Sequence, residues 1–245
     1  MASMIEWRIG TVRTVVDETP SVRSFTLDVP EWAGHRAGQH VDVRLTAEDG
    51  YSVERSYSIA SAPAAGAVEI TVERIPDGEV SAFLHDTVVV GDRLELRGPI
   101  GGYFVWEAAT GGPLLLIAGG SGIVPLMAIL RERSRGASPV PARLLFSSRH
   151  YEEIIYREEL ASLAARSDGL DVIHTLTRSQ PPGWTGFGRR IDDRMLAEVA
   201  APLGVDAKVY ICGPTALVET AADALSRLGW PPDRVRTERF GPTGS

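Results

Sequence analysis

The chain has 245 residues, enough for two ordinary domains or one large one. A hydrophobic content of 44% and a mean hydropathy of −0.02 indicate a soluble globular protein. The net charge of −7, without a visible cluster of Lys and Arg, argues against nucleic acid as a partner. The single cysteine excludes an intrachain disulfide and an iron–sulfur cluster ligated by this chain alone. The sequence shows no signal-peptide pattern and no membrane-length apolar run, so we predict a cytoplasmic protein.

The first half of the chain, residues 7–99, is built from short runs in which apolar and polar residues alternate. These runs lie at 25–29, 41–45, 68–73 and 94–96. Turn-forming residues separate them, and only residues 81–86 suggest a helical turn. Period-two alternation of this kind predicts an antiparallel sheet or barrel.

The pattern changes at residues 107–113, where Ala, Thr and Gly dominate, so we predict domains 1–106 and 107–245. Beyond this boundary we expect strands at 114–118, 143–147, 170–176, 208–212 and 234–240. Between them we expect helices at 123–135, 152–165, 192–200 and 214–228. Alternating strands and helices predict a parallel sheet with helices on both faces.

One segment of the first half, residues 55–61, combines a cation, an aromatic ring and hydroxyl groups on a predicted strand. Arg55 suits phosphate oxygens, Tyr57 can stack on a ring, and Ser58 can hydrogen-bond to its edge. These residue types would hold a large, flat ligand that carries phosphate. Taken alone, the segment is explained better by a half-buried strand with a solvated Arg and a core Tyr.

A glycine-rich turn joins the first strand and the first helix of the second half. Gly120, Ser121 and Gly122 would let a pyrophosphate approach the free N–H groups of the helix N-terminus, with Pro125 in the first helical turn. An ordinary strand–helix turn is the alternative. Cys212, followed by Gly213 and Pro214, ends a later strand at the sheet edge where ligands bind, or is simply a small buried residue.

Three weaker candidates complete the set. Gly78, before the predicted helical turn, could present backbone N–H groups to a phosphate, or could be a plain turn. Arg149, after the second strand of the second half, could read a ribose 2′-phosphate or be an exposed side chain. Glu238 and Phe240, on the last strand, could approach a ligand or form an ordinary strand end. The five histidines have no metal-ligand spacing, and we assign no metal site.

In this order, the motifs resemble those of the ferredoxin–NADP⁺ reductase family over essentially the whole chain. The matching segments are Arg-Ser-Tyr-Ser at 55–58, Gly-Glu-Val-Ser at 78–81, Gly-Gly-Ser-Gly-Ile-Val-Pro at 119–125, Cys-Gly-Pro at 212–214 and Glu-Arg-Phe at 238–240. The resemblance implies a six-stranded antiparallel flavin-binding barrel followed by a Rossmann-like nicotinamide-binding domain. It favours FAD over FMN and NADPH over NADH.

The resemblance also implies roles for individual residues. The residues expected to bind flavin are Arg55, Ser56, Tyr57, Ser58, Val72, Arg74, Gly78, Val80, Ser81 and Phe240. Those expected to bind the nicotinamide dinucleotide are Gly120, Ser121, Gly122, Ser148, Arg149, Cys212, Gly213 and Pro214. Ser58, Cys212 and Glu238 are the expected catalytic residues, acting near flavin N5 and nicotinamide C4.

By this resemblance the protein moves hydride from NAD(P)H to flavin N5 and passes electrons to a separate protein, such as a ferredoxin, flavodoxin or oxygenase component. Two alternatives stay open. One is a reductase of free flavin or small oxidants, and the other is a non-catalytic flavin-binding electron-transfer subunit. The sequence departs from plant-type members, which end in an aromatic residue, because five residues follow Phe240.

Overall fold

The computed structural model describes residues 6–63, 66–136 and 139–240. The chain forms two compact units. The first contains Met1–Glu107 with Met127–Glu132, and the second contains Ala108–Leu126 with Arg133–Ser245. Within the described residues, no helix has the length and apolar character needed to cross a membrane.

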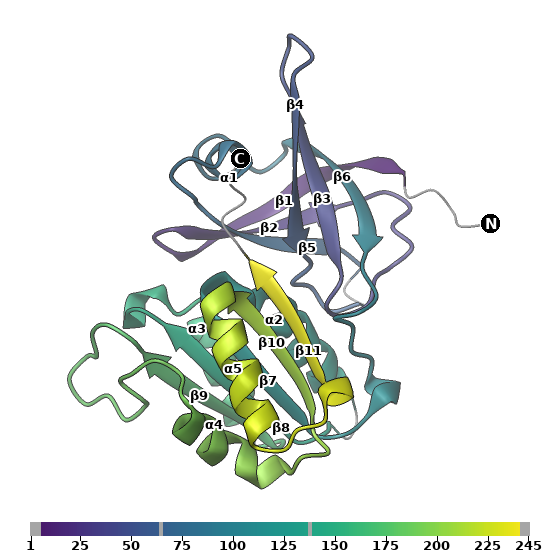
Figure 1. Ribbon diagram of the computed structural model, residues 1–245. Coiled ribbons are helices and arrows are strands. Elements are labelled where there is room, and N and C mark those ends of the chain that lie inside the picture. Colours follow the sequence, from purple (N-terminus) through teal and green to yellow (C-terminus); the bar gives the residue numbers. More distant parts are fainter. Residues whose placement is uncertain (1–5, 64–65, 137–138, 241–245) are drawn as a thin grey trace. The chain divides into compact units, whose positions relative to one another are not determined.

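The first unit is a six-stranded antiparallel sheet that closes on itself (Figure 1). Its strands are β1 (Trp7–Thr19), β2 (Val22–Asp28), β3 (His40–Thr46), β4 (Ser52–Ser58), β5 (Val68–Glu73) and β6 (Arg93–Ile100). They lie in the order β4-β3-β6-β1-β2-β5. Ile59, directly after β4, bridges to Ile70 of β5, so the two ends of the sheet meet. The predicted six-stranded antiparallel barrel is confirmed.

Alternation along these strands directs one set of apolar side chains into a common core. Phe25, Leu27, Val41 and Val43 are fully buried there, together with other residues from the remaining strands and α1. The α-helix between β5 and β6, α1 (Glu79–Asp86), begins two residues earlier than the predicted helical turn. It begins there because Gly78 ends the extended backbone and serves as N-cap.

The second unit is a five-stranded parallel sheet, as predicted. Its strands are β7 (Leu114–Gly119), β8 (Ala142–Ser148), β9 (Leu170–Leu176), β10 (Lys208–Pro214) and β11 (Val235–Phe240), in the order β11-β10-β7-β8-β9. All six residues of the central strand β7 are buried. This burial explains its unbroken apolar sequence, because a central parallel strand is covered on both faces.

Helices cover both faces of this sheet. They are α2 (Ile123–Arg135), α3 (Arg157–Ala165), α4 (Asp193–Ala200) and α5 (Thr215–Arg227). The apolar faces of α4 and α5 share one core with Leu115, Ile117 and Ile211 of the sheet. Figure 1 shows α5 in front of the sheet and α2 behind it.

The helix predicted from residue 152 is wrong at its beginning, because α3 starts only at Arg157. A short 3₁₀ turn occupies Tyr151–Glu153, Ile154 is extended, and Tyr156 takes a left-handed φ of 56°. Ile154, Ile155 and Tyr156 are 2–3% exposed. Tertiary burial of these three side chains therefore overrides the local helical pattern.

Candidate functional site

Strand β4 presents Arg55 and Tyr57 on one face. Their cross-strand partners on β3 are Val43 and Val41, which are buried in the barrel core. The Tyr57 ring packs against that core, and burial raises the pKa of its hydroxyl. The Arg55 guanidinium donates a 2.7 Å hydrogen bond to the carbonyl of Glu54. The strand thus holds a cation and an aromatic ring on the same side, as the sequence predicts.

The structure does not bring the Ser56 side chain to that face. Successive side chains on a strand point to opposite faces, and the Ser56 hydroxyl donates a 2.6 Å hydrogen bond to Asp42 Oδ1. Asp42 also accepts a 2.7 Å bond from Arg97. The side chain of Ser56 therefore ties β4 to β3. Ser58, at the end of β4, is 7% exposed.

The first turn of α1 lies close to β4. The two elements are in contact, and the Tyr51 hydroxyl before β4 donates a 3.1 Å bond to Glu79 Oε2. The Ser81 hydroxyl accepts from the Ile75 N–H at 3.2 Å and donates to the Gly78 carbonyl at 3.1 Å. A Cβ on Gly78 would lie 2.4 Å from Ser81 Oγ. The turn is therefore built around this hydroxyl, and the N–H groups of the first helical turn are left for a ligand.

The side chains of Val72 and Arg74 contact other residues of the protein. Val72 is fully buried in the barrel core, together with the 1%-exposed Val80. Arg74 donates three bonds to Asp86 at the end of α1, at 2.9, 3.1 and 3.3 Å. Neither Val72 nor Val80 presents its side chain at the surface, and any ligand contact of theirs would use the backbone.

In the second unit, the predicted nucleotide motifs meet at one edge of the sheet. Parallel strands share their carboxyl edge, and β7, β8, β10 and β11 pair in parallel register. The segments that end these strands are the turn Gly120–Gly122, Ser148 with Arg149, Cys212 with Gly213, and Glu238. Such an edge is where open α/β sheets bind ligands.

The glycine turn packs backbone to backbone against the end of β10. A Cβ on Gly122 would lie 2.2 Å from the carbonyl oxygen of Cys212, which is closer than any real contact. Gly213 has φ +154°, and a Cβ there would lie 3.0 Å from the Gly119 nitrogen. Only glycine fits both places. The turn that opens α2 is thereby held as a bare-backbone cradle, which fits the pyrophosphate of a dinucleotide.

Cys212 and Glu238 are neighbours across β10 and β11. Cys212 is fully buried, and burial, with a further contribution from Glu238, raises the pKa of its thiol well above the usual value. Burial also raises the pKa of Glu238 to about 7. Glu238 Oε2 is buried and has no hydrogen-bond partner among the described residues. Buried polar atoms are rarely left unsatisfied, so this carboxyl oxygen is a candidate for contact with a bound group.

Ser148 and Arg149 differ in the hydrogen bonds that their side chains make. The Ser148 hydroxyl is a second buried group without a hydrogen-bond partner in the described structure. Arg149, in contrast, donates a 2.8 Å bond to Glu153 Oε2. Phe240, at the end of β11, is 37% exposed. The tail after it, residues 241–245, lies outside the described residues.

Sequence reasoning missed the carboxylates that engage predicted site residues, namely Asp42 with Ser56, Asp86 with Arg74 and Glu153 with Arg149. Glu153 stands four residues after Arg149, a spacing that signals an ion pair on a helix, but this segment is not an α-helix. Asp42 is brought to Ser56 only by the pairing of β3 with β4.

Two family models match the chain in succession. Residues 10–105 match the oxidoreductase FAD-binding domain, and residues 116–223 match the oxidoreductase NAD-binding domain. The chain therefore contains an FAD-binding domain followed by an NAD-binding domain.

Known proteins extend this match. The glycine betaine monooxygenase reductase subunit of Pseudomonas aeruginosa is 33% identical over 94% of the chain, and the match spans 63% of that relative's length. NADH-cytochrome b5 reductase 1 of Aspergillus terreus is 32% identical over 89% of the chain and 76% of its own length. The flavohem-like FAD/NAD-binding domain of nitric oxide dioxygenase from Vibrio cholerae superimposes with a TM-score of 0.82 at 28% identity, covering 96% of this chain and 99% of that one. The chain belongs to the ferredoxin–NADP⁺ reductase-like family of FAD- and NAD-binding oxidoreductases.

Proposed function

We propose that the protein is an FAD-dependent NAD(P)H oxidoreductase that passes electrons to a separate acceptor protein. The observation that carries this proposal is the carboxyl edge of the second sheet. There, the bare-backbone turn of Gly120–Gly122 lies against β10, and the unsatisfied carboxyl oxygen of Glu238 lies one strand away. The Gly120–Gly122 turn can bind the pyrophosphate of a dinucleotide, and Glu238 can contact the nicotinamide ring of the same ligand.

We assign residues 1–106 to flavin binding and residues 107–245 to nicotinamide binding. On the barrel, Arg55 and the first turn of α1 suit the flavin phosphates, while Tyr57 and Ser58 suit its ring system. On the second unit, Gly120, Ser121 and Gly122 suit the nicotinamide pyrophosphate. We also keep Ser56, Val72 and Arg74 in the proposed flavin-binding set. Their side chains contact other barrel residues, so they would contact the flavin through the backbone.

A bound flavin supplies the conversion between two-electron transfer from a nicotinamide and one-electron transfer to an acceptor. The protein supplies binding and orientation. Cys212 remains a neutral thiol, because burial raises its pKa, and its small, polarisable side chain would pack beside a bound nicotinamide. Glu238, with a pKa of about 7, can hold or release a proton near neutral pH. Ser58 offers a hydroxyl as hydrogen-bond partner for the ring edge of the flavin.

The acceptor is proposed from the relatives. Their names describe a reductase subunit of a monooxygenase and a reductase of cytochrome b5, so each is named for a separate protein component. We therefore propose a one-electron acceptor protein, such as a ferredoxin or an oxygenase component. Because the chain spans only 63% of the first of these relatives, this partner and the complete activity belong to the proposal.

Anaerobic titration of the purified protein tests the function. We expect a yellow protein whose flavin absorbance is bleached rapidly and stoichiometrically by NADPH or NADH. Reduction of a purified ferredoxin by the bleached protein would support the acceptor class, whereas reduction of free flavin alone would favour the flavin reductase alternative. A bound flavin that neither nucleotide bleaches would contradict the oxidoreductase.

The choice between NADPH and NADH rests on Arg149. Its guanidinium is 2.8 Å from Glu153, and that carboxylate would repel a 2′-phosphate. We expect Arg149→Ala to raise KM for NADPH about tenfold or more and to leave KM for NADH nearly unchanged, since a hydrogen bond between charged groups contributes about 1.5–3 kcal/mol.

The matched variant is Glu153→Gln, which keeps the shape of the Arg149 partner and removes its charge. It should lower KM for NADPH and leave that for NADH unchanged. Steady-state kinetics with both nucleotides measure this selectivity. Equal effects on the two nucleotides in Arg149→Ala would remove Arg149 from the 2′-phosphate site.

We also propose a cytoplasmic location. A single cysteine in 245 residues suits a reducing compartment, where disulfides are not needed. Fractionation of cells that produce the protein would test this location.

A further inference from the structure

A basic pocket of about 170 Å³ lies at the end of the second sheet opposite the glycine turn. Its lining residues are Lys208, Tyr210, Asp233, Arg234 and Arg236. Lys208 begins β10, and Arg234 directly precedes β11, so the pocket belongs to the amino ends of these strands. Lys208 and Cys212 are four residues apart on β10, which places them about 13 Å from each other at ~3.3 Å per residue. The pocket is therefore separate from the proposed nicotinamide site.

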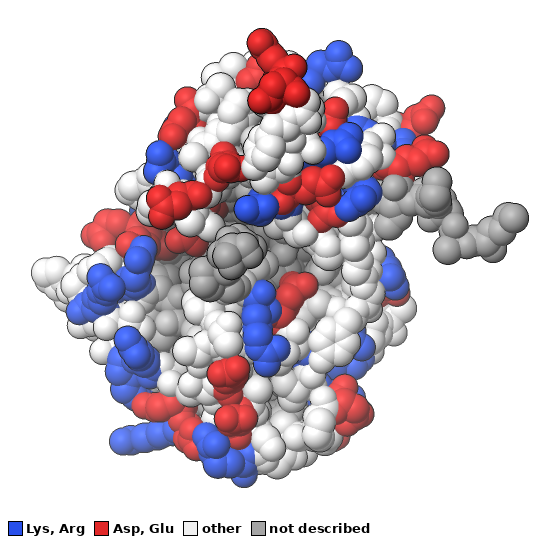
Figure 2. All heavy atoms as spheres, turned by 45° about the horizontal axis from the view of Figure 1, so that its top comes forward, with Lys and Arg blue, Asp and Glu red and all other residues white. Residues whose placement is uncertain are grey.

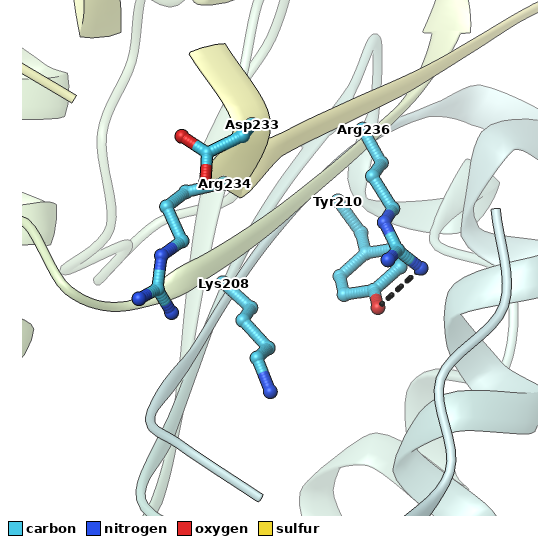
Figure 3. Close-up of a pocket in the computed structure, with 5 residues that line it drawn as sticks. All are labelled: Lys208, Tyr210, Asp233, Arg234 and Arg236. Atoms are coloured by element: carbon cyan, nitrogen blue, oxygen red, sulfur yellow. Dashed lines mark hydrogen bonds between the residues drawn. The ribbon is translucent and has the colours of Figure 1, made fainter. Parts of the chain in front are cut away.

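The side chains in this pocket hold an excess of positive charge, with three cations against the carboxylate of Asp233. Figure 3 shows the Arg236 side chain beside the Tyr210 ring, and the side chains of Lys208 and Arg234 separate from that pair. Arg236 Nη1 lies 3.4 Å from the Tyr210 hydroxyl, and its guanidinium carbon is 5.6 Å from the ring centre. Tyr210 thus forms an aromatic wall on which one of the cations rests.

Lys208 and Arg234 direct their hydrogen bonds to backbone carbonyls. Lys208 Nζ donates to Thr110 and, at 3.2 Å, to Gly111, while Arg234 Nη1 donates to Asp206 at 3.4 Å. Carbonyl oxygens orient these cations without neutralising them. Burial lowers the pKa of Lys208, and the charges of Arg234 and Arg236 lower it further. An anion in the pocket would relieve this repulsion.

We propose that this pocket is a binding site for a small phosphate-bearing anion. Two guanidinium groups and an ammonium group match the several oxygens of a phosphate, because Arg binds such anions bidentately and Lys binds them as a point charge. The phosphate comes either free or as a small ester, and the volume of the pocket accommodates a phosphate group. Figure 2 shows acidic and basic side chains interspersed over one face of the molecule. Local groups of charges, and not the net charge, therefore determine where an anion binds.

Residue-resolved NMR titration of the FAD-loaded protein tests this site separately from the proposed function. Inorganic phosphate and glycerol phosphate are added at constant ionic strength, with chloride as the reference anion. We expect saturable shifts of the backbone amides of Lys208, Arg234 and Arg236 with at least one of the phosphates and none with chloride. Because the amides of Gly120–Gly122 are followed in the same spectra, binding at the nicotinamide site is read independently.

The decisive variant is Arg234→Gln, whose side chain makes one long bond, of 3.4 Å, within the part of the chain that the structure describes. It should weaken phosphate binding about tenfold or more, as expected for the loss of a hydrogen bond between charged groups. Arg166→Gln removes the same charge from an exposed position after α3 and should bind phosphate like the unmodified protein. Lys208→Gln provides a second test inside the pocket. Shifts that do not saturate, or affinities that are equal in Arg234→Gln and Arg166→Gln, would overturn the proposal.

Discussion

Replacing Gly122 by Ala is expected to destabilise the protein by about 3 kcal/mol or more and to abolish nicotinamide binding. The added Cβ would lie 2.2 Å from the carbonyl oxygen of Cys212 and 2.4 Å from its carbonyl carbon. Both atoms are backbone, so no side chain can rotate away, and either the turn or the end of β10 must move. Overpacking at rigid positions typically costs about 1–3 kcal/mol, occasionally more.

The position of Gly122 makes the effect local. The turn opens α2 and lies at the proposed pyrophosphate cradle, and the barrel strands that suit the flavin are elsewhere in the chain. We expect this displacement of the turn or of β10 to lower the urea midpoint of unfolding and to abolish NADP⁺ binding in a spectrophotometric titration. The flavin content of the folded fraction should stay close to that of the unmodified protein.

Gly136→Ala is the matched control, because Gly136 stands at the other end of the same helix. Its Cβ would meet nothing closer than the Arg133 carbonyl oxygen at 3.5 Å, an ordinary contact. This variant should have the same urea midpoint and the same nucleotide affinity as the unmodified protein. If Gly122→Ala behaved in the same way, the close approach of the turn to β10 would be wrong.

The second large effect concerns Glu238 and pH. Its pKa is about 7 in the folded protein because burial disfavours the charged carboxylate, whereas the reference value is 4.5. Between pH 4.5 and 7 the folded state therefore binds more protons than the unfolded state, and stability falls as pH rises. The loss is complete above pH 7 and is on the order of 3 kcal/mol, from about 1.4 kcal/mol per pKa unit.

Glu238→Gln removes this titration while keeping the shape of the side chain. Relative to the unmodified protein, the variant should gain stability steadily from pH 4.5 to 7 and hold that gain at pH 8. Urea midpoints measured across this range provide the comparison. Glu219→Gln, at an exposed position on α5, should give a curve parallel to that of the unmodified protein. A parallel curve for Glu238→Gln would show that Glu238 does not titrate near neutral pH.

The Glu238→Gln variant also distinguishes an effect on stability from a role in the reaction. If Glu238 handles a proton during turnover, then Glu238→Gln should flatten the pH dependence of kcat near pH 7 as well as that of stability. A change in stability alone would identify Glu238 as a buried carboxyl without a role in the reaction.

The sequence predicted the two sheets because their periodicities differ. Period-two alternation at 68–73 indicated a half-buried antiparallel strand, and the unbroken apolar run of Leu114–Gly119 indicated a central parallel one. The segment around Tyr156 could not be predicted in this way. Its left-handed backbone results from burial of neighbouring side chains, and that burial depends on the completed fold.

The candidate site was predictable to the level of strand ends and turns. Parallel topology brings Gly122, Cys212 and Glu238 to one edge whatever the side-chain details. Side-chain contacts between neighbouring strands could not be predicted, because the register of the strands was unknown. The hydrogen bond of Ser56 to Asp42 was therefore missed. The basic pocket was missed for a related reason, because Lys208 and Arg234 are distant in sequence and meet only through the pairing of β10 with β11.

The bridge between Ile59 and Ile70 has a consequence for self-association. By joining the end of β4 to β5, this bridge shortens the free edges of the first sheet onto which another molecule could add a strand. The second sheet is open, but its outer strands carry their own protection. β11 carries Arg236 and Arg239, and Phe187 pairs with Thr175 along β9. Charges and a covering loop are common defences against intermolecular β-pairing, so this chain is built to resist aggregation through its sheets.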